Sequence, residues 1–188
     1  GPVTDVELEM IAQTWSEHCK HKIFNATIRH AEGGREETIR SLFRTYIRAT
    51  TDRLAGRRRF LRSVFSDNSG VVAFDRRALV CFKVETHNSP SALDPYGGAI
   101  TGIVGVYRDP LGTGKGSKLV MGGWGFCVGL RDYSGPLKPR LHPRRLLDGV
   151  IEGVRDGGNK SGIPTAFGQV LFHPGYMGKC LVFVTAVG

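Results

Sequence analysis

The spacing of apolar residues predicts two helices in the first third of the chain. Apolar side chains recur at helical intervals over residues 5–17, with Thr4 or Asp5 as N-cap, and we expect Trp15 to anchor a core. A second helix is predicted over 36–55, where the apolar positions follow the i, i+3, i+4, i+7 pattern. Its opposite face would carry a stripe of arginines four residues apart: Arg40, Arg44 and Arg48.

Beyond residue 70, short strand patterns alternate with helical ones. β-Branched and aromatic runs predict strands at 71–75 and 78–86, joined by a tight turn, and later strands at 118–130, 169–173 and 180–187. The Gly122–Gly123 pair predicts a bulge. Residues 87–98 are rich in proline and glycine and predict a loop. Helices are expected over 99–109 and from Pro143 to Asp156, the second ended by Gly157 and Gly158.

This order predicts an α+β fold, with a single mixed or antiparallel sheet and helices packed on one face. We expect two parts, a helical arm with a basic helix over residues 1–70 and a folded domain over 71–188. If 118–130 and 180–187 are strands, the sheet face that the helices leave open is largely apolar. The second sheet face therefore needs a cover, which we expect to be another domain or a second copy of the chain.

Composition narrows the class of protein. The 188 residues are 40% apolar, as in a globular protein, and neither a run of about 18 apolar residues nor a signal-peptide pattern occurs. The four cysteines are scattered and form no C-x-x-C pair, which favours a reduced, cytoplasmic protein.

The net charge of +9 is concentrated in one stretch. Ten arginines and four acidic residues lie between Arg29 and Arg62. Such a stretch attracts nucleic acid or phosphorylated metabolites, or it is only a solvated helix face. Composition leaves these alternatives open. A basic nucleic-acid-binding module remains an alternative function, although Phe43 and Tyr46 lie on the apolar face rather than among the arginines.

The segment "TWSEHCKHK" concentrates candidate ligands and bases in nine residues. A zinc site would need His18, Cys19 and His21 to face one metal, but neighbouring helical side chains diverge by about 100°. No second ligand pair at zinc spacing occurs elsewhere. A catalytic histidine or a polar helix end are the other interpretations.

A second dense segment, "FKVETHNSPSALDPYGGAITGIVGVYRD", lies at the end of a predicted strand. Alternation puts Lys83, Glu85 and His87 on one face of that strand. Such a trio suits a phosphate, a Mg²⁺ ion and a proton transfer, and Arg108 and Asp109 add a further charge pair. The pattern is neither the phosphate loop of P-loop proteins nor the dinucleotide fingerprint.

Three segments in the same order resemble the phosphoribosylformylglycinamidine synthase family of purine biosynthesis: "WSEHCKHK", "KVETHNSPSALDPYGGAITGIVGVYRD" and "GVIEGVRDGGNKSGIPTAFGQVLFHPGYMGKCLVFVTAVG". The resemblance implies the N-terminal-domain fold of the aminoimidazole ribonucleotide synthetase superfamily, in which two sheets pair into a barrel-like core. It also implies an ATP-dependent ligase. This enzyme converts formylglycinamide ribonucleotide, with ammonia from a glutaminase subunit or domain, to formylglycinamidine ribonucleotide.

The resemblance assigns roles by motif. His18 corresponds to the active-site histidine, and His87 to a proton acceptor. The remaining matches are ATP contacts (Lys83 and His21), Mg²⁺ ligands (Glu85 and Asp109) and substrate contacts (Thr86, His87, Asn88, Ser89 and Arg108).

The chain departs from the family at three places. Ser89 replaces a histidine, His21 replaces a tyrosine, and residues 110–126 differ from the family's small-residue run. Family members continue with further domains, so the resemblance implies an N-terminal fragment. We expect negligible synthetase activity from the fragment alone, with a second synthetase domain or a second copy needed on the open sheet face.

Overall fold

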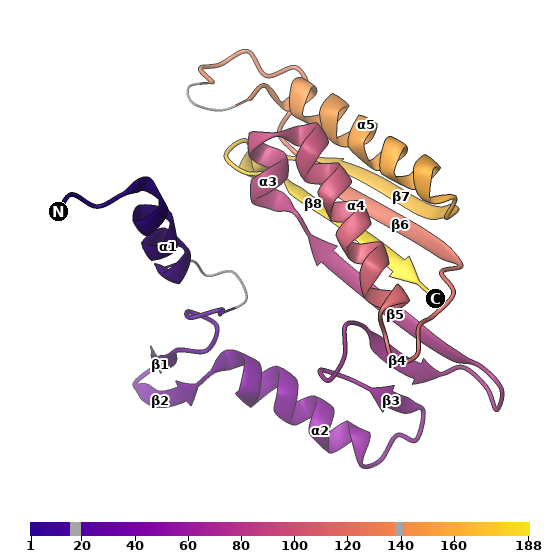
Figure 1. Ribbon diagram of the computed structural model, residues 1–188. Coiled ribbons are helices and arrows are strands. Elements are labelled where there is room, and N and C mark those ends of the chain that lie inside the picture. Colours follow the sequence, from indigo (N-terminus) through magenta and orange to yellow (C-terminus); the bar gives the residue numbers. More distant parts are fainter. Residues whose placement is uncertain (16–19, 138–140) are drawn as a thin grey trace. The chain divides into compact units, whose positions relative to one another are not determined.

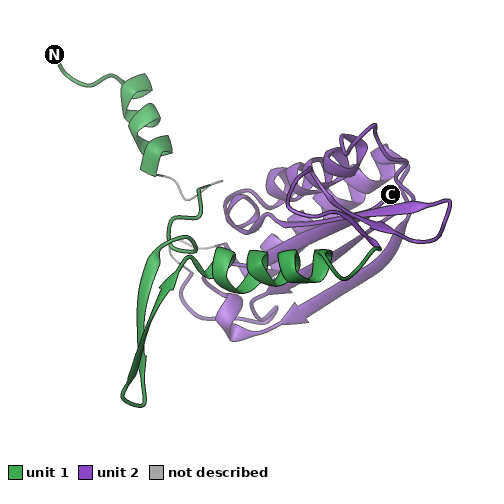
Figure 2. Cartoon of the chain, turned by 90° about the horizontal axis from the view of Figure 1, so that it is seen from below, with its two compact units in different colours: residues 1–59 green, residues 60–188 purple. Residues whose placement is uncertain are grey.

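The computed structural model describes residues 1–15, 20–137 and 141–188, and the chain divides into two compact units, 1–59 and 60–188 (Figure 2). The sheet of the second unit begins before residue 70, since its first strand is β3 (Leu61–Ser63). No helix in the described part of the chain is both long and apolar enough to cross a membrane.

The first unit opens with helix α1 (Asp5–Trp15), which begins at a capping box. The Thr4 hydroxyl accepts a hydrogen bond from Glu7 N, and Thr4 N donates to the Glu7 carboxylate at 2.9 Å. The prediction that Trp15 anchors a core is wrong within this structure, because its side chain is 76% exposed.

The helix predicted over 36–55 is wrong in its first third. Strands β1 (Thr27–Glu32) and β2 (Arg35–Arg40) pair as a hairpin, and Gly33 and Gly34 at its turn have φ values of +57° and +77°. Two residues with positive φ favour the tight turn of a hairpin over a helix. Helical structure follows only in the π-helical η1 (Phe43–Arg48) and in α2 (Ala49–Ala55). The predicted arginine stripe is therefore incomplete, because Arg40 lies on a strand.

The second unit contains a six-stranded sheet in the order β3-β4-β5-β8-β6-β7. Among the strand pairs of the described residues, β6 and β7 alone are parallel, so the sheet is mixed, as predicted. The strands after β3 are β4 (Gly70–Ala73), β5 (Leu79–Thr86), β6 (Met121–Val128), β7 (Thr165–Phe172) and β8 (Leu181–Val187). The predicted bulge is confirmed by a register shift between Gly122 and Gly123.

Helices α3 (Asn88–Leu93), α4 (Pro95–Leu111) and α5 (Pro143–Ser161) lie on one side of this sheet (Figure 1). The short 3₁₀ turn η2 (Pro174–Tyr176) joins β7 to β8. The core lies between helices and sheet, where several side chains are at most 2% exposed: Ala99, Ile103, Val106, Phe126, Val150, Val182 and Val184.

The bounds of two helical segments of the second unit differ from the prediction. The expected loop at 87–98 contains α3 and the start of α4, because Pro95 stands at the first position of α4, where no backbone N–H is needed. Helix α5 continues past Gly157 and Gly158 to Ser161, and Gly162, at φ +70°, ends it. Gly157 lies inside the helix, at a position where a side chain would overlap Ile103 of α4.

The other sheet face is open and apolar. Alternation turns Val182 and Val184 toward the helices, whereas Leu181 and Phe183 face the open side and are half-buried. Phe82, Val84, Phe167 and Leu171 share that open face through their strand partners and are each about half exposed. The expected α+β sheet with helices on one face is confirmed.

Candidate functional site

Four ionisable residues meet between the end of β5 and the C-terminal half of α4. The Lys83 Nζ lies 2.6 Å from Asp109 Oδ2 and 3.5 Å from Glu85 Oε2. The His87 Nε2 lies 3.7 Å from Glu85 Oε1. Lys83 thus stands between two carboxylates, with the imidazole on the far side of Glu85. We call these four residues the β5–α4 cluster.

Strand alternation explains why Lys83 and Glu85 point the same way. Their partners across β8 are Ala186 and Val184, whose side chains face the helices. Both polar side chains therefore lie on the helix-covered face, at its rim, where Lys83 keeps 25% and Glu85 keeps 46% of its side-chain surface exposed. Asp109 comes from α4, 24 residues after Glu85 in the chain, and only the packing of α4 on the sheet brings it here.

Glycines on α4 make room for the imidazole. A Cβ atom at Gly102 would lie 2.8 Å from His87 Nδ1, and one at Gly105 would lie 3.9 Å from Nε2. Gly102, Gly105 and Asp109 follow i, i+3, i+7 spacing and so share one helix face. At Gly102 the group that approaches the α4 backbone is the His87 ring.

Within the cluster the pKa of Lys83 is raised and the pKa of His87 is lowered. Burial lowers the pKa of Lys83, but the hydrogen bond and charge of Asp109, helped by Glu85, outweigh it and leave the pKa raised. Burial also lowers the pKa of His87, an effect that Glu85 opposes and Lys83 reinforces. Near neutral pH the cluster therefore holds a charged lysine beside a neutral imidazole that is able to accept a proton.

The lowered His87 pKa predicts a loss of stability in mild acid. The unfolded chain takes up a proton on this residue at higher pH than the folded chain. The contribution of His87 is therefore fully present above its ordinary value of 6.5 and is lost as the pH falls through the lowered folded pKa. Urea unfolding at about pH 7.5 and about pH 5.5 measures it.

The matched variants are His87→Asn, which should lose this part of the pH dependence, and His30→Asn, at an exposed position in β1, which should keep it. An unchanged pH dependence in His87→Asn would contradict the prediction.

The other predicted substrate contacts are close to the β5–α4 cluster in the chain, but their side chains have different surroundings. Thr86 ends β5 and pairs with Phe183, so alternation turns it to the open sheet face. Asn88 anchors α3 to β8, because its side-chain oxygen accepts a hydrogen bond from Val182 N at 2.8 Å. Ser89 and Arg108 are exposed, on α3 and next to Asp109 respectively.

Two predicted site residues lie apart from this geometry. His18, the predicted catalytic histidine, falls outside the described residues, and so does Cys19. His21 belongs to the first unit, where it lines a cavity of about 510 Å³ with Phe24, Asn25 and Phe43. Its role as an ATP contact stays a prediction.

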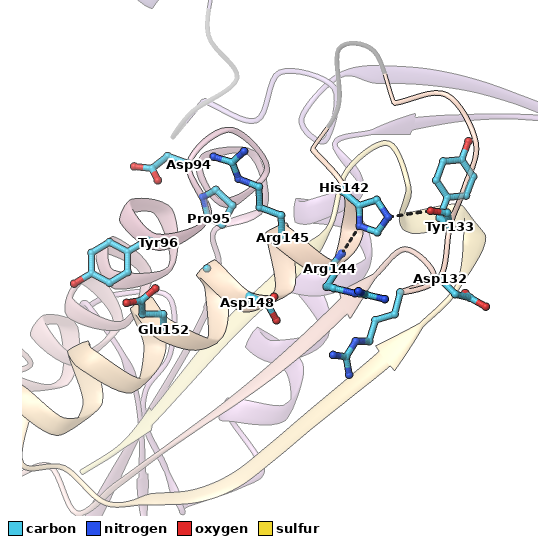
Figure 3. Close-up of a pocket in the computed structure, with 12 residues that line it drawn as sticks. Asp94, Pro95, Tyr96, Asp132, Tyr133, His142, Arg144, Arg145, Asp148 and Glu152 are labelled. Atoms are coloured by element: carbon cyan, nitrogen blue, oxygen red, sulfur yellow. Dashed lines mark hydrogen bonds between the residues drawn. The ribbon is translucent and has the colours of Figure 1, made fainter.

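A larger cavity, of about 790 Å³, lies at the N-terminal end of α4, whereas the β5–α4 cluster lies toward its C-terminal end (Figure 3). It is lined by the start of α4, by the first three turns of α5 and by residues 131–133. Pro95 and Asp109 are 14 positions apart on α4, so about 20 Å of helix separates this cavity from Asp109. His142 is held there by Arg144 N at 3.1 Å and the Tyr133 carbonyl at 2.9 Å, so both ring nitrogens are engaged with backbone. That bonding leaves His142 as a helix cap rather than a base.

The donor set of the β5–α4 cluster fits magnesium better than zinc. Among the described residues, no group of three or more His, Cys, Asp or Glu side chains could hold a metal. Mg²⁺ commonly takes only one or two protein carboxylates, with water and phosphate oxygens completing its shell, and Glu85 and Asp109 supply such a pair. The described cysteines, Cys81, Cys127 and Cys180, are free.

Comparison with known proteins identifies the family to which the chain belongs. The family model described as "AIR synthase related protein, N-terminal domain" matches residues 66–188, and that of the "Formylglycinamide ribonucleotide amidotransferase linker domain" matches residues 2–22. The phosphoribosylformylglycinamidine synthase subunits PurL of Chlorobium chlorochromatii and Picrophilus torridus are 34% and 35% identical over 98% of this chain. The chain spans 20% and 22% of their lengths, about a fifth.

Solved structures of PurL also match nearly the whole of this chain. Those of T. maritima PurL complexed with ATP and with FGAR are each 30% identical, with a TM-score of 0.60. Each match covers 99% of this chain, and 24% and 23% of the respective PurL chains.

Proposed function

The chain belongs to the AIR synthase related protein family, whose N-terminal domain occupies residues 66–188, and from that premise we propose that it forms one nucleotide- and substrate-binding domain of a phosphoribosylformylglycinamidine synthase. The observation that carries the proposal is the β5–α4 cluster, in which Lys83 lies between Glu85 and Asp109. The bound ATP and FGAR of the T. maritima PurL structures support the same assignment.

In the proposed reaction, the amide oxygen of formylglycinamide ribonucleotide takes the terminal phosphoryl group of ATP, and ADP leaves. Ammonia then adds to the activated carbon, phosphate leaves, and the amidine remains. Such a transfer depends on positioning and on neutralising charge more than on covalent chemistry.

The residues of the β5–α4 cluster have separate tasks in this proposal. Lys83, which is cationic and has a raised pKa, would neutralise phosphoryl oxygens. His87, neutral and partly buried, would accept a proton as ammonia is added. Glu85 and Asp109 would hold Mg²⁺, which when bound offsets charge on the transferred group. Arg108, exposed and next to Asp109, is free to contact the substrate.

The open sheet face supports the proposed partner. The apolar side chains of β5 and β7 that are about half exposed on this face need a cover of matching shape. We propose that a second synthetase domain of the same fold, or a second copy of this chain, packs there. A glutaminase subunit or domain would deliver ammonia to the complete enzyme. A chain that spans about a fifth of its relatives should have negligible synthetase activity by itself.

Nucleotide binding tests the proposal directly. Calorimetric titration of the chain with Mg·ATP should show binding, and Lys83→Ala should weaken it at least about tenfold, because a charge-assisted contact to phosphate is lost. Lys179→Ala, at an exposed position between β7 and β8, is the matched control and should bind as the wild type does.

The same titration with single-stranded DNA and RNA at moderate salt tests the alternative function, a basic nucleic-acid-binding module. Salt-sensitive nucleic-acid binding by a chain that does not respond to Mg·ATP would replace the ligase assignment with a nucleic-acid-binding function carried by the arginine-rich stretch.

A further inference from the structure

Two buried polar side-chain atoms have no hydrogen-bond partner among the described residues, and they belong to residues four positions apart in the chain. They are His87 Nδ1 and the hydroxyl oxygen of Ser91. Ser91 is fully buried, at 0% exposure, and its hydroxyl is unused by the roles assigned above. Leaving a buried polar atom without a partner is costly, so two such atoms at one place need a common explanation.

The backbone brings the two residues together. Ser91 N donates a hydrogen bond to the His87 carbonyl at 3.2 Å, which makes the residues neighbours across the first turn of α3. A helical side chain points back toward the N-terminus of its helix, and at Ser91 that direction leads to His87.

The glycine face of α4 fixes the spacing between the two side chains. A Cβ atom at Gly98 would lie 2.7 Å from Ser91 Cα, and one at Gly102 would lie 2.8 Å from His87 Nδ1. These glycines are one turn apart, about 6 Å along the helix. A serine hydroxyl reaches over part of that distance, and what remains suits a single bridging water.

We propose that Ser91 is a positioning residue, whose hydroxyl is joined to His87 Nδ1 by a hydrogen-bonded bridge through one buried water. A hydroxyl both donates and accepts, so it satisfies Nδ1 whichever ring nitrogen carries the proton. The bond fixes the plane of the ring against α4 and keeps Nε2 turned toward Glu85, where the Nε2–Oε1 distance is 3.7 Å. The importance of this orientation for proton transfer rests on the proposed function, whereas the bond itself does not.

The test is a comparison of Ser91→Ala with the wild type by ¹⁵N NMR of the histidine side chains at one pH, without nucleotide. The His87 Nδ1 resonance should shift in Ser91→Ala, because that nitrogen loses its partner. Ser91→Cys, which keeps a weak donor, should restore part of the shift. Ser134→Ala, an exposed serine in the β6–α5 segment, should leave the His87 signals in place.

A double-mutant cycle adds a second readout. Ser91→Ala should lower the urea midpoint in the wild type and have a smaller effect in a His87→Phe background, where no ring nitrogen remains to be bonded. An unmoved Nδ1 resonance, or an equal effect of Ser91→Ala in both backgrounds, would overturn the role of Ser91. Neither readout uses ATP, so failure here is distinguishable from failure of Mg·ATP binding, which would count against the proposed function instead.

Discussion

Gly153→Ala should destabilise the second unit by about 3 kcal/mol, since overpacking at a rigid contact typically costs 1–3 kcal/mol and sometimes more. Gly153 lies where α5 contacts α4. A Cβ atom there would lie 2.5 Å from the Tyr96 carbonyl oxygen and 3.0 Å from Ala99 Cβ. The first is a backbone atom inside a helix, so it cannot rotate away, and the helices would have to separate.

Gly158→Ala on the same helix provides the matched control. The nearest atom to an added Cβ there is Ile103 Cδ1, at an ordinary 3.7 Å. Alanine should therefore stabilise α5 by roughly 0.5–1 kcal/mol through its better helix propensity. Urea unfolding followed by circular dichroism measures both variants. Equal effects at the two positions would mean that the α4–α5 contact yields more easily than its geometry indicates.

Placing lysines on the open sheet face should abolish self-association of the chain. Phe167 and Leu171 lie on that face of β7 and are 48% and 50% exposed. The double variant Phe167→Lys, Leu171→Lys puts two charges where an apolar partner would have to bury them, and burying an unpaired charge is strongly unfavourable. We expect the dimer dissociation constant to rise at least about a hundredfold, a difference of about 3 kcal/mol.

Sedimentation velocity over a range of concentrations measures the association. Leu93→Lys, at a residue of α3 that is 84% exposed on the helix side of the sheet, should associate as the wild type does. A wild-type chain that remains monomeric at high concentration, or a double variant that still dimerises, would argue that the face is covered by something other than a second copy.

Local sequence patterns predicted most elements of the second unit. Runs of β-branched residues around Val71 and Val80 form the β4–β5 hairpin, and the glycine pair at 122–123 forms the bulge. The helix predicted over 36–55 was wrong in part because two sequence signals conflicted there. The apolar periodicity after residue 36 favoured a helix, although Gly33 and Gly34 set the φ values of a hairpin turn that draws Ile39 into a strand.

Glycines inside α5 show a limit of local reasoning. By propensity, Gly157 and Gly158 predict the end of a helix. In the structure the helix continues through both residues, and Gly157 lies against Ile103 of a helix about 50 residues earlier, where there is no room for a side chain. Such a contact leaves no trace in the spacing of residues along α5 itself.

In the candidate site, too, some relations between residues follow from the sequence and others only from the tertiary structure. The sequence by itself determined that Lys83 and Glu85 project from one face of a strand, because side chains alternate with period two whatever surrounds them. Only the tertiary structure decided that Asp109 pairs with Lys83, that Gly102 faces the His87 ring and that Ser91 is buried beside it. Those relations depend on how α3 and α4 pack on the sheet, and packing is set by the shapes of side chains distant in sequence rather than by the period of any one segment.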